Sequence, residues 1–278
     1  VTHATGHFAL RMVPAGTYRL AFEDSRLASI GVSTAHHDIR LRPGATVVAD
    51  LGVPSLSTLR HGCARPRGAL PTPAGGMITG IVRAAGDERP LEGALVRISW
   101  IDLQHAASIL EQFASTVVET KTDSLGRYRV CGVPDSAFAN VMAAGPHSTT
   151  GEVQTQVGPV GIARVNLRLA EVAEGESEPP AGALAGVVMD SLGAPVGDAQ
   201  VTLDGSSATT RTDAAGRFRL APVQSGTQTI EVKRVGLDVA RRPIDIAPSA
   251  TTTVSFTLVR SHLLDRMLIT AQRERSSP

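Results

Sequence analysis

Short runs in which apolar and polar residues alternate recur along the whole chain. Tyr128 and Val130 are separated by an arginine, and so are Phe218 and Leu220. A period of two places every second side chain on the same face of a β-strand. Further runs of this kind lie at 18–22, 94–98, 165–169, 199–203, 230–232 and 254–258. Glycine and proline fall between the runs, so the pattern predicts an all-β protein of antiparallel strands joined by turns.

One phrase marks the start of several of these strands. Residues 122–130 and 212–220 share the order Thr-Asp-x-x-Gly-Arg-aromatic-Arg-aliphatic, and residues 2–10 carry a degraded copy with His3 in place of the aspartate. An Asp side chain can accept backbone N–H bonds inside a turn, and Gly supplies the positive φ that closes it. Each copy therefore predicts a tight turn that leads into a half-buried strand.

The surroundings of the two complete copies keep the same register, because equal numbers of residues separate Pro90 from Ile98 and Pro195 from Leu203. The earlier copy is longer by an insertion at 99–119. Within it, 117–120 favours a strand, whereas Ile101, His105, Ile109 and Phe113 have the spacing of one side of a short helix. We expect either a longer hairpin or a small helical turn there.

Repeats and composition shifts together predict tandem antiparallel β-sandwich modules joined by Pro/Gly linkers. The module at 1–59 lacks its early strands, so we expect it to be less stable than the others. The expected segments are a truncated module at 1–59, a linker at 60–76, a module at 77–170, an acidic linker at 171–182, a module at 183–259 and a tail at 260–278.

Charge and hydropathy exclude some partners. The formal net charge is +1, which gives no overall field toward nucleic acid or an anionic membrane. No apolar stretch reaches the ~18 residues of a membrane-spanning helix, so we expect no such segment. The chain begins at Val1 without a basic region followed by an apolar one. It therefore has the features of a fragment or a processed product.

Motif searches predict no catalytic, cofactor-binding or metal site. His-Glu-x-x-His, Gly-x-Ser-x-Gly, the dinucleotide fingerprint and the P-loop do not occur in the sequence. The densest group of possible metal ligands is 36–38, His-His-Asp. Adjacent residues of a strand point to opposite faces, so a solvated loop is expected there. We therefore expect a protein that is not an enzyme and needs no cofactor.

The repeated phrases resemble those of the carboxypeptidase regulatory-like domain, a transthyretin-like, Ig-like β-sandwich. The resemblance rests on Gly-x-Val, Pro-x-x-Gly/Asp-Ala-x-Val, Thr-Asp-x-x-Gly-Arg and Val-Pro-x-Gly-x-Tyr, and it covers both complete modules and the truncated one. It implies a module that accompanies a catalytic domain, forms arrays on secreted bacterial proteins, or lies at the periplasmic N-terminus of outer-membrane receptors. The implied location is periplasmic, associated with the outer membrane, or extracellular.

The tail carries a second resemblance. Residues 263–271 are similar to the TonB-box-like strand that precedes the plug of TonB-dependent receptors, although Arg266 replaces the usual acidic residue. The alternative is one more strand followed by a basic tail. The residues that carry this resemblance are Leu264, Asp265, Met267, Leu268, Ile269 and Thr270.

Two functions remain open from the sequence. The first is a spacer or interaction segment of the bacterial envelope, with a protein partner such as a TonB-type protein. The second is an array of carbohydrate-binding modules with a glycan partner, since the fold is grouped with carbohydrate-binding-like folds. Trp100 is the only Trp and thus a candidate ligand contact, with a core position beside Ile98 as the alternative. An aromatic content of 3% argues against several sugar sites.

The two cysteines, Cys63 and Cys131, are too few for a structural zinc site built from cysteines alone. They are either two free thiols or one disulfide. In an exported array, a bond between them would pin the linker to the second sandwich, and we favour that pairing.

Overall fold

The computed structural model describes residues 6–23, 27, 36–52, 63, 75–101, 115–134, 137–158, 161–173 and 175–260. Every named element in this part of the chain is a β-strand, which confirms the all-β class. In the same segments no helix has the length and hydropathy needed to cross a membrane. The chain forms two compact units. Unit 1 comprises Val1–Arg83, Arg89–Ala144 and Gln154–Leu167, and unit 2 comprises Ala84–Glu88, Gly145–Val153 and Arg168–Pro278.

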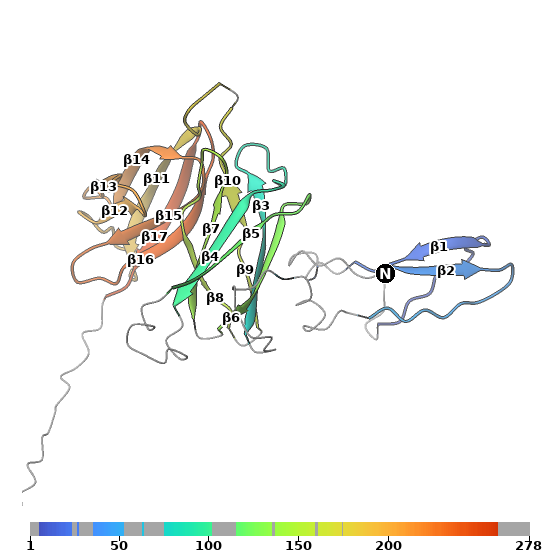
Figure 1. Ribbon diagram of the computed structural model, residues 1–278. Helices are drawn as coiled ribbons and strands as arrows, with labels where there is room; N and C mark the ends of the chain where they lie inside the picture. The colour runs from blue at the N-terminus through green and yellow to red at the C-terminus, as the bar shows by residue number, and fades with distance from the viewer. Residues whose placement is uncertain are drawn as a thin grey trace, which may run out of the picture. The chain divides into compact units, whose positions relative to one another are not determined.

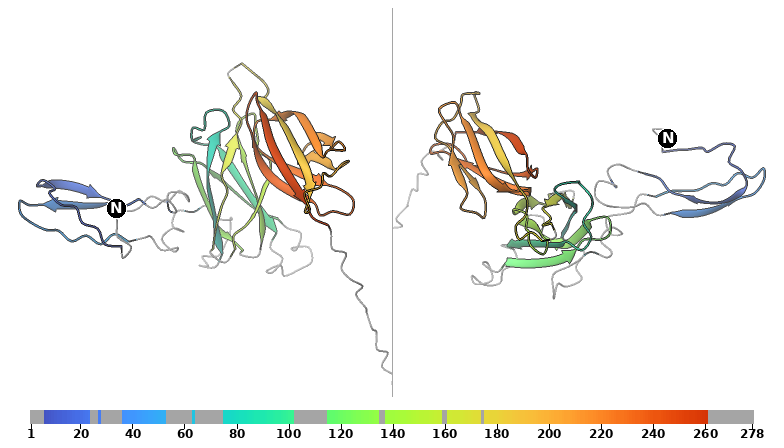
Figure 2. Two further views of the ribbon diagram at one scale, coloured as in Figure 1. Left: turned by 180° about the vertical axis from the view of Figure 1, so that it is seen from behind. Right: turned by 90° about the horizontal axis from the view of Figure 1, so that it is seen from above.

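Unit 2 contains a β-sandwich of two sheets (Figure 1). Its strands are β11 (Ala181–Asp190), β12 (Gln200–Leu203), β13 (Thr209–Arg211), β14 (Arg217–Gln224), β15 (Gly226–Lys233), β16 (Ala240–Ile246) and β17 (Thr251–Leu258). One sheet has the order β14-β11-β17, and in the other β12 and β15 lie between β13 and β16. Side chains of both sheets enclose a core that includes Leu184, Val201, Phe218, Ile230 and Phe256. Figure 2 shows these strands from two further directions.

Unit 1 repeats this strand order. Its strands are β3 (Gly76–Ala84), β4 (Leu95–Ile101), β5 (Ser115–Lys121), β6 (Arg127–Val133), β7 (Phe138–Ala144), β8 (Val153–Gln156) and β9 (Ile162–Arg164). β3 pairs antiparallel with β6 and parallel with β9, as β11 does with β14 and β17. The order β5-β4-β7-β8 matches β13-β12-β15-β16. A further short strand, β10 (Leu167–Leu169), ends within unit 2, where its Leu169 pairs with Gly226 of β15.

A buried threonine hydroxyl opens each copy of the repeated turn. In unit 2, Thr212 Oγ1 accepts the Ala199 N–H at 2.8 Å and donates to the Val196 carbonyl at 2.7 Å. Thr212 is 6% exposed. The hydroxyl therefore supplies partners for two backbone groups that would otherwise be buried without any. The same two bonds recur in unit 1 between Thr122, Ala94 and Leu91.

The aspartate and the glycine of the phrase shape the turn as the sequence predicts. Asp213 Oδ1 accepts the N–H groups of Ala215 and Arg217, at 2.9 and 2.8 Å. Gly216 has a φ of 72°, and a Cβ atom there would lie 2.4 Å from the Val188 carbonyl oxygen. Only glycine fits this position without strain. Equivalent roles in unit 1 belong to Asp123, Leu125, Arg127, Gly126 and Val82.

The described part of 1–59 forms one antiparallel pair, β1 (Gly16–Leu20) and β2 (His37–Leu41). No described residue of this segment is buried. A two-stranded sheet of this kind has little apolar burial to stabilise it. The module and linker boundaries expected from the sequence stay predictions.

The insertion at 99–119 extends a hairpin. Residues 115–121 form β5, which pairs with β4 from Leu95 to Ile101, and this confirms the strand expected at 117–120. His105, Ile109 and Phe113 lie outside the described residues, so the helical turn is not tested.

Replacing the buried hydroxyl of Thr212 should destabilise unit 2. We expect Thr212→Val to lower the free energy of unfolding by about 1–3 kcal/mol, because it leaves the Ala199 N–H and the Val196 carbonyl buried without a partner. Urea denaturation followed by circular dichroism measures the change. Thr251→Val, at an exposed strand position, is the matched control and should change it by less than about 0.5 kcal/mol. Equal effects of the two variants would contradict the assigned role.

The turn aspartate should also make unit 1 sensitive to acid. Burial opposes ionisation of Asp123, but hydrogen bonds from Arg127 and from the Leu125 N–H outweigh it, so its pKa is lowered. A lowered pKa stabilises the fold above the unfolded value of 3.8, and this contribution is lost as the pH falls through the folded pKa. Unfolding monitored by Trp100 fluorescence below about pH 4 should show a shallower pH dependence in Asp123→Asn. Ser124→Ala, which keeps the carboxylate, should retain the original slope. A pH dependence of unfolding in Asp123→Asn equal to that of the wild type would contradict this prediction.

Candidate functional site

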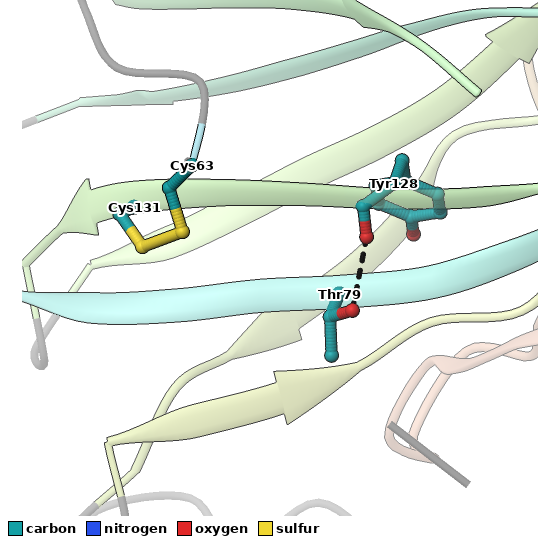
Figure 3. Close-up of a disulfide and its surroundings, with 4 residues drawn as sticks. All are labelled: Cys63, Thr79, Tyr128 and Cys131. Atoms are coloured by element: carbon teal, nitrogen blue, oxygen red, sulfur yellow. Dashed lines mark hydrogen bonds between the residues drawn. A yellow bond between two sulfur atoms is a disulfide. The ribbon is translucent and has the colours of Figure 1, made fainter. Parts of the chain in front are cut away.

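A disulfide joins the expected linker to the sandwich of unit 1 (Figure 3). Cys63 and Cys131 are bonded, with 5.6 Å between their Cα atoms and a sequence separation of 68. Cys131 belongs to β6, which pairs only with β3 among the described strands and thus forms an edge of its sheet. The bond fixes Cys63 at this edge. The pairing favoured from the sequence is the one that the structure contains.

The disulfide covers a small second core on the outer face of the sheet. Met77 lies opposite Cys131 in the β3–β6 ladder, and both are buried. Strand alternation turns their side chains away from the face that carries Ile78. Leu27, Cys63 and Ile162 pack against this pair and are partly buried. The bond therefore closes an apolar contact to which Leu27, from the N-terminal segment, also contributes.

Hydrogen bonds also hold β6 and β3 together. Thr79 Oγ1 donates to the Tyr128 carbonyl at 2.9 Å (Figure 3). The phenol of Tyr128 donates to the Val165 carbonyl at 2.6 Å, and its burial raises the pKa of the hydroxyl. The Val165 N–H in turn donates to the Thr79 carbonyl at 2.9 Å. Tyr128 thus stays protonated and joins β6 to the segment that follows β9.

Trp100 lies inside the sandwich rather than on its surface. It is 4% exposed, and in the ladders of β4 it lies opposite Thr116 of β5 and Ala139 of β7. A sugar-binding ring needs one open face. The burial favours the interpretation of Trp100 as a core residue beside Ile98 over that of a ligand contact.

The TonB-box-like residues lie outside the described part of the chain, and the resemblance of this tail stays a prediction. They are Leu264, Asp265, Met267, Leu268, Ile269 and Thr270.

Sequence reasoning missed a polar network in unit 2. The Arg168 guanidinium donates to the carboxylates of Glu88 and Asp245. Thr227 Oγ1 donates to Asp245 at 2.6 Å and accepts the Arg168 N–H at 2.8 Å. The hydrogen bond to Glu88 raises the pKa of Arg168. Burial acts in the opposite direction, and the charge of Asp245 adds to the rise. The members are far apart in sequence, so no local pattern could reveal the network.

Other charged groups of the described residues, Asp198 and Asp38 among them, also make structural contacts. The Asp198 carboxylate accepts hydrogen bonds from the guanidinium groups of Arg211 and Arg234, each at 2.6 Å. The hydrogen bond from Arg211 is the main cause of the lowered pKa of Asp198. Asp38, in the 36–38 segment, pairs with Arg19 at 3.4 Å. Within the described ranges, no three His, Cys, Asp or Glu residues are grouped so that they could hold a metal ion.

Comparison with known proteins identifies one domain. Residues 183–259, which contain all but the start of β11 and run through β17, match the family of carboxypeptidase regulatory-like domains. No curated protein matches the chain.

Several solved structures are distantly similar. A cohesin–X-dockerin complex from Acetivibrio cellulolyticus is 15% identical over 28% of this chain and 58% of that chain, with a TM-score of 0.25. This chain therefore spans less than two thirds of it. The minor pilin GBS52 of Streptococcus agalactiae is 13% identical over 73% and 100% of the two chains, with a TM-score of 0.27. The D295N mutant of the shaft pilin SpaA of Lactobacillus rhamnosus GG is 14% identical over 68% and 99% of the two chains, with a TM-score of 0.26.

Removing the disulfide should destabilise unit 1 selectively. We expect Cys63→Ser/Cys131→Ser to lower its free energy of unfolding by about 2–4 kcal/mol, since the bond closes a long loop in the unfolded chain. Fluorescence of Trp100, the only Trp, reports unfolding of this unit. Reduction of the wild type should produce the same loss.

Two controls accompany this experiment. Hydrogen exchange of the β15 amides reports unit 2 and should not change. Mass spectrometry of the native, unreduced protein should show no free thiol. Two free thiols, or a double variant as stable as the wild type, would refute the assignment.

Proposed function

We propose that the chain is a non-catalytic array of β-sandwich modules that serves as a spacer and interaction segment of an exported bacterial envelope or secreted protein. The observation that carries the proposal is the disulfide between Cys63 and Cys131. Such bonds form and persist mainly in oxidising compartments, such as the periplasm and the cell exterior. A covalently fixed linker also suits a segment that sets the position of its neighbours.

The perturbed ionisable groups support a structural role over a catalytic one. Strong pKa shifts often mark active sites when they arise from a charged partner inside a cleft. Here, despite the opposing effect of burial, the pKa of Asp123 is lowered by the hydrogen bonds of its turn, and the pKa of Tyr128 is raised by burial of its hydroxyl. The pKa values of Arg168 and Asp198 are shifted by the ion pairs that each of them makes. Each of these groups already has a structural task.

The repeated topology supports the tandem part of the proposal. β3 to β9 follow the strand order of β11 to β17, and the threonine and glycine of the turn make the same contacts in both units. We therefore infer that 77–170 is a second carboxypeptidase regulatory-like module. The segment 1–59 is interpreted as a truncated third.

The finer proposal gives the array a partner. In it the chain is the periplasmic N-terminal part of a TonB-dependent receptor, and 264–270 is the segment that a TonB-type protein binds. Extended segments of this kind bind by adding a strand to a partner's sheet. The carbohydrate-binding alternative is weaker, because it depends on Trp100, which is buried.

A binding experiment tests the proposed partner. The full chain is immobilised, and the purified periplasmic domain of a TonB-type protein is passed over it. Retention is expected for the wild type and for a variant lacking 272–278, and it should be lost when 263–271 is deleted. Failure of the wild type to bind would overturn the receptor proposal. Binding to a glycan array that Trp100→Ala abolishes, with the fold retained, would replace it with the carbohydrate-binding alternative.

A further inference from the structure

Strand β17 forms an edge of its sheet in unit 2. It pairs in parallel with β11 from Ala183–Thr251 to Asp190–Leu258, and with no other described strand. The Ala183 N–H donates to the Ala250 carbonyl at 2.8 Å, so the backbone groups of even-numbered residues of this strand face β11. Those of the odd-numbered residues face away from the sheet. These residues, which are also exposed, are Thr251, Thr253, Ser255 and Thr257.

The edge of β17 differs from the other described edges in its composition. Its sequence, Thr-Thr-Thr-Val-Ser-Phe-Thr-Leu, contains no charge, proline or glycine over 8 residues. Natural sheets protect their edges with charges, prolines, kinks or short strands. The edges β5, β6, β14 and β16 carry charged residues, β14 and β16 also contain proline, and β8, β9 and β13 have four residues or fewer. Among the described strands, β17 is the long edge without such protection.

Two contacts reach the outward side of this edge: the Asp238 N–H donates to the Val259 carbonyl at 2.7 Å, just beyond the end of β17, and Arg242 reaches the middle of the strand. Arg242 of β16 lies over the ring of Phe256, 4.7 Å from its centre, and donates to the Ser255 carbonyl at 2.9 Å. The bond confirms that the backbone of Ser255 faces outward. It occupies one lone pair of one carbonyl. The N–H groups of Thr253 and Thr257 have no partner among the described residues.

We propose that β17 is a homotypic docking edge that pairs antiparallel with β17 of a second copy of this chain. A strand that pairs with itself around a two-fold axis brings its own side chains together, and like charges directly opposite each other are destabilising. Charged edges such as β14 or β16 would meet this penalty along their length, whereas β17 has no charged side chain of its own and a charge reaches it only at Ser255, from Arg242. The neutrality therefore favours a second copy over a charged partner.

The geometry of β17 fits a pairing centred on Val254. In this register Thr253 lies opposite Ser255 of the second copy, and Thr251 lies opposite Thr257. Hydroxyl side chains opposite one another form favourable cross-strand pairs. The outward N–H and carbonyl groups then pair across the axis, and the two β14-β11-β17 sheets become one continuous sheet. The inference stands on β17 alone and does not depend on the proposed envelope role.

One strand pair gives a weak, reversible dimer. It covers less than the roughly 800 Å² per partner of a standard interface, so we expect a dissociation constant in the micromolar range or above. Copies held side by side on one surface would reach a high effective concentration, and there a weak contact becomes occupied.

Sedimentation velocity of the full chain, from micromolar to near-millimolar concentration, tests the proposal. The wild type should associate reversibly. Thr253→Pro removes an outward N–H without breaking the ladder to β11, and Thr253→Lys places like charges near the axis. Each should weaken association at least about tenfold. Ser115→Lys, on the already charged edge β5, is the control and should behave as the wild type. Circular dichroism confirms that each variant is folded.

Hydrogen exchange of the Thr253 and Thr257 amides shows whether a second copy or the chain itself covers the edge. In the homotypic dimer these amides exchange fast in dilute protein and become protected as the concentration rises. Protection that is already complete in the dilute monomer would mean that the chain covers its own edge, and it would overturn the proposal. A chain that stays monomeric throughout, or folded Thr253 variants that associate like the wild type, would overturn it as well.

Discussion

The buried threonine hydroxyl at the start of each turn is the contact on which both sandwiches depend. Thr212 lies where the chain passes from β13 in one sheet to β14 in the other, and it bonds to the segment that passes from β11 to β12. One hydroxyl thus fastens two connections that cross between the sheets. The apolar core can fill the space between the sheets because their separation is fixed at this point. Thr122 performs the same task in unit 1.

The two units share this framework and differ at their sheet edges. In unit 1, β6 carries Cys131, and the disulfide places Cys63 and a small apolar cluster against it. In unit 2, the equivalent strand β14 is protected by arginines and Pro222 instead. β17 carries neither device. Sandwiches with the same strand order can therefore bind different segments when only the residues at their edges differ.

Local features of the fold could be predicted from the sequence, and distant contacts could not. The alternation around Phe218 and the Asp-x-x-Gly turns are local sequence patterns. The all-β class and the turn chemistry could therefore be predicted from them. The role of Thr212 depends on Ala199, and that of Arg168 on Glu88 and Asp245. Such partners are brought together only by the fold. Trp100 showed the same limit, because composition cannot tell a buried indole from an exposed one.

The parallel pairing of β17 with β11 also constrains the order of events during synthesis. β11 is made first, but its partner emerges only after the five intervening strands, so the sheet cannot close until the end of the module has left the ribosome. Contacts between such distant segments form slowly, because the loop between them must be closed first. Until then the apolar residues of β11 lack their neighbour on that side. A nascent module is consequently most exposed to misassembly during this interval.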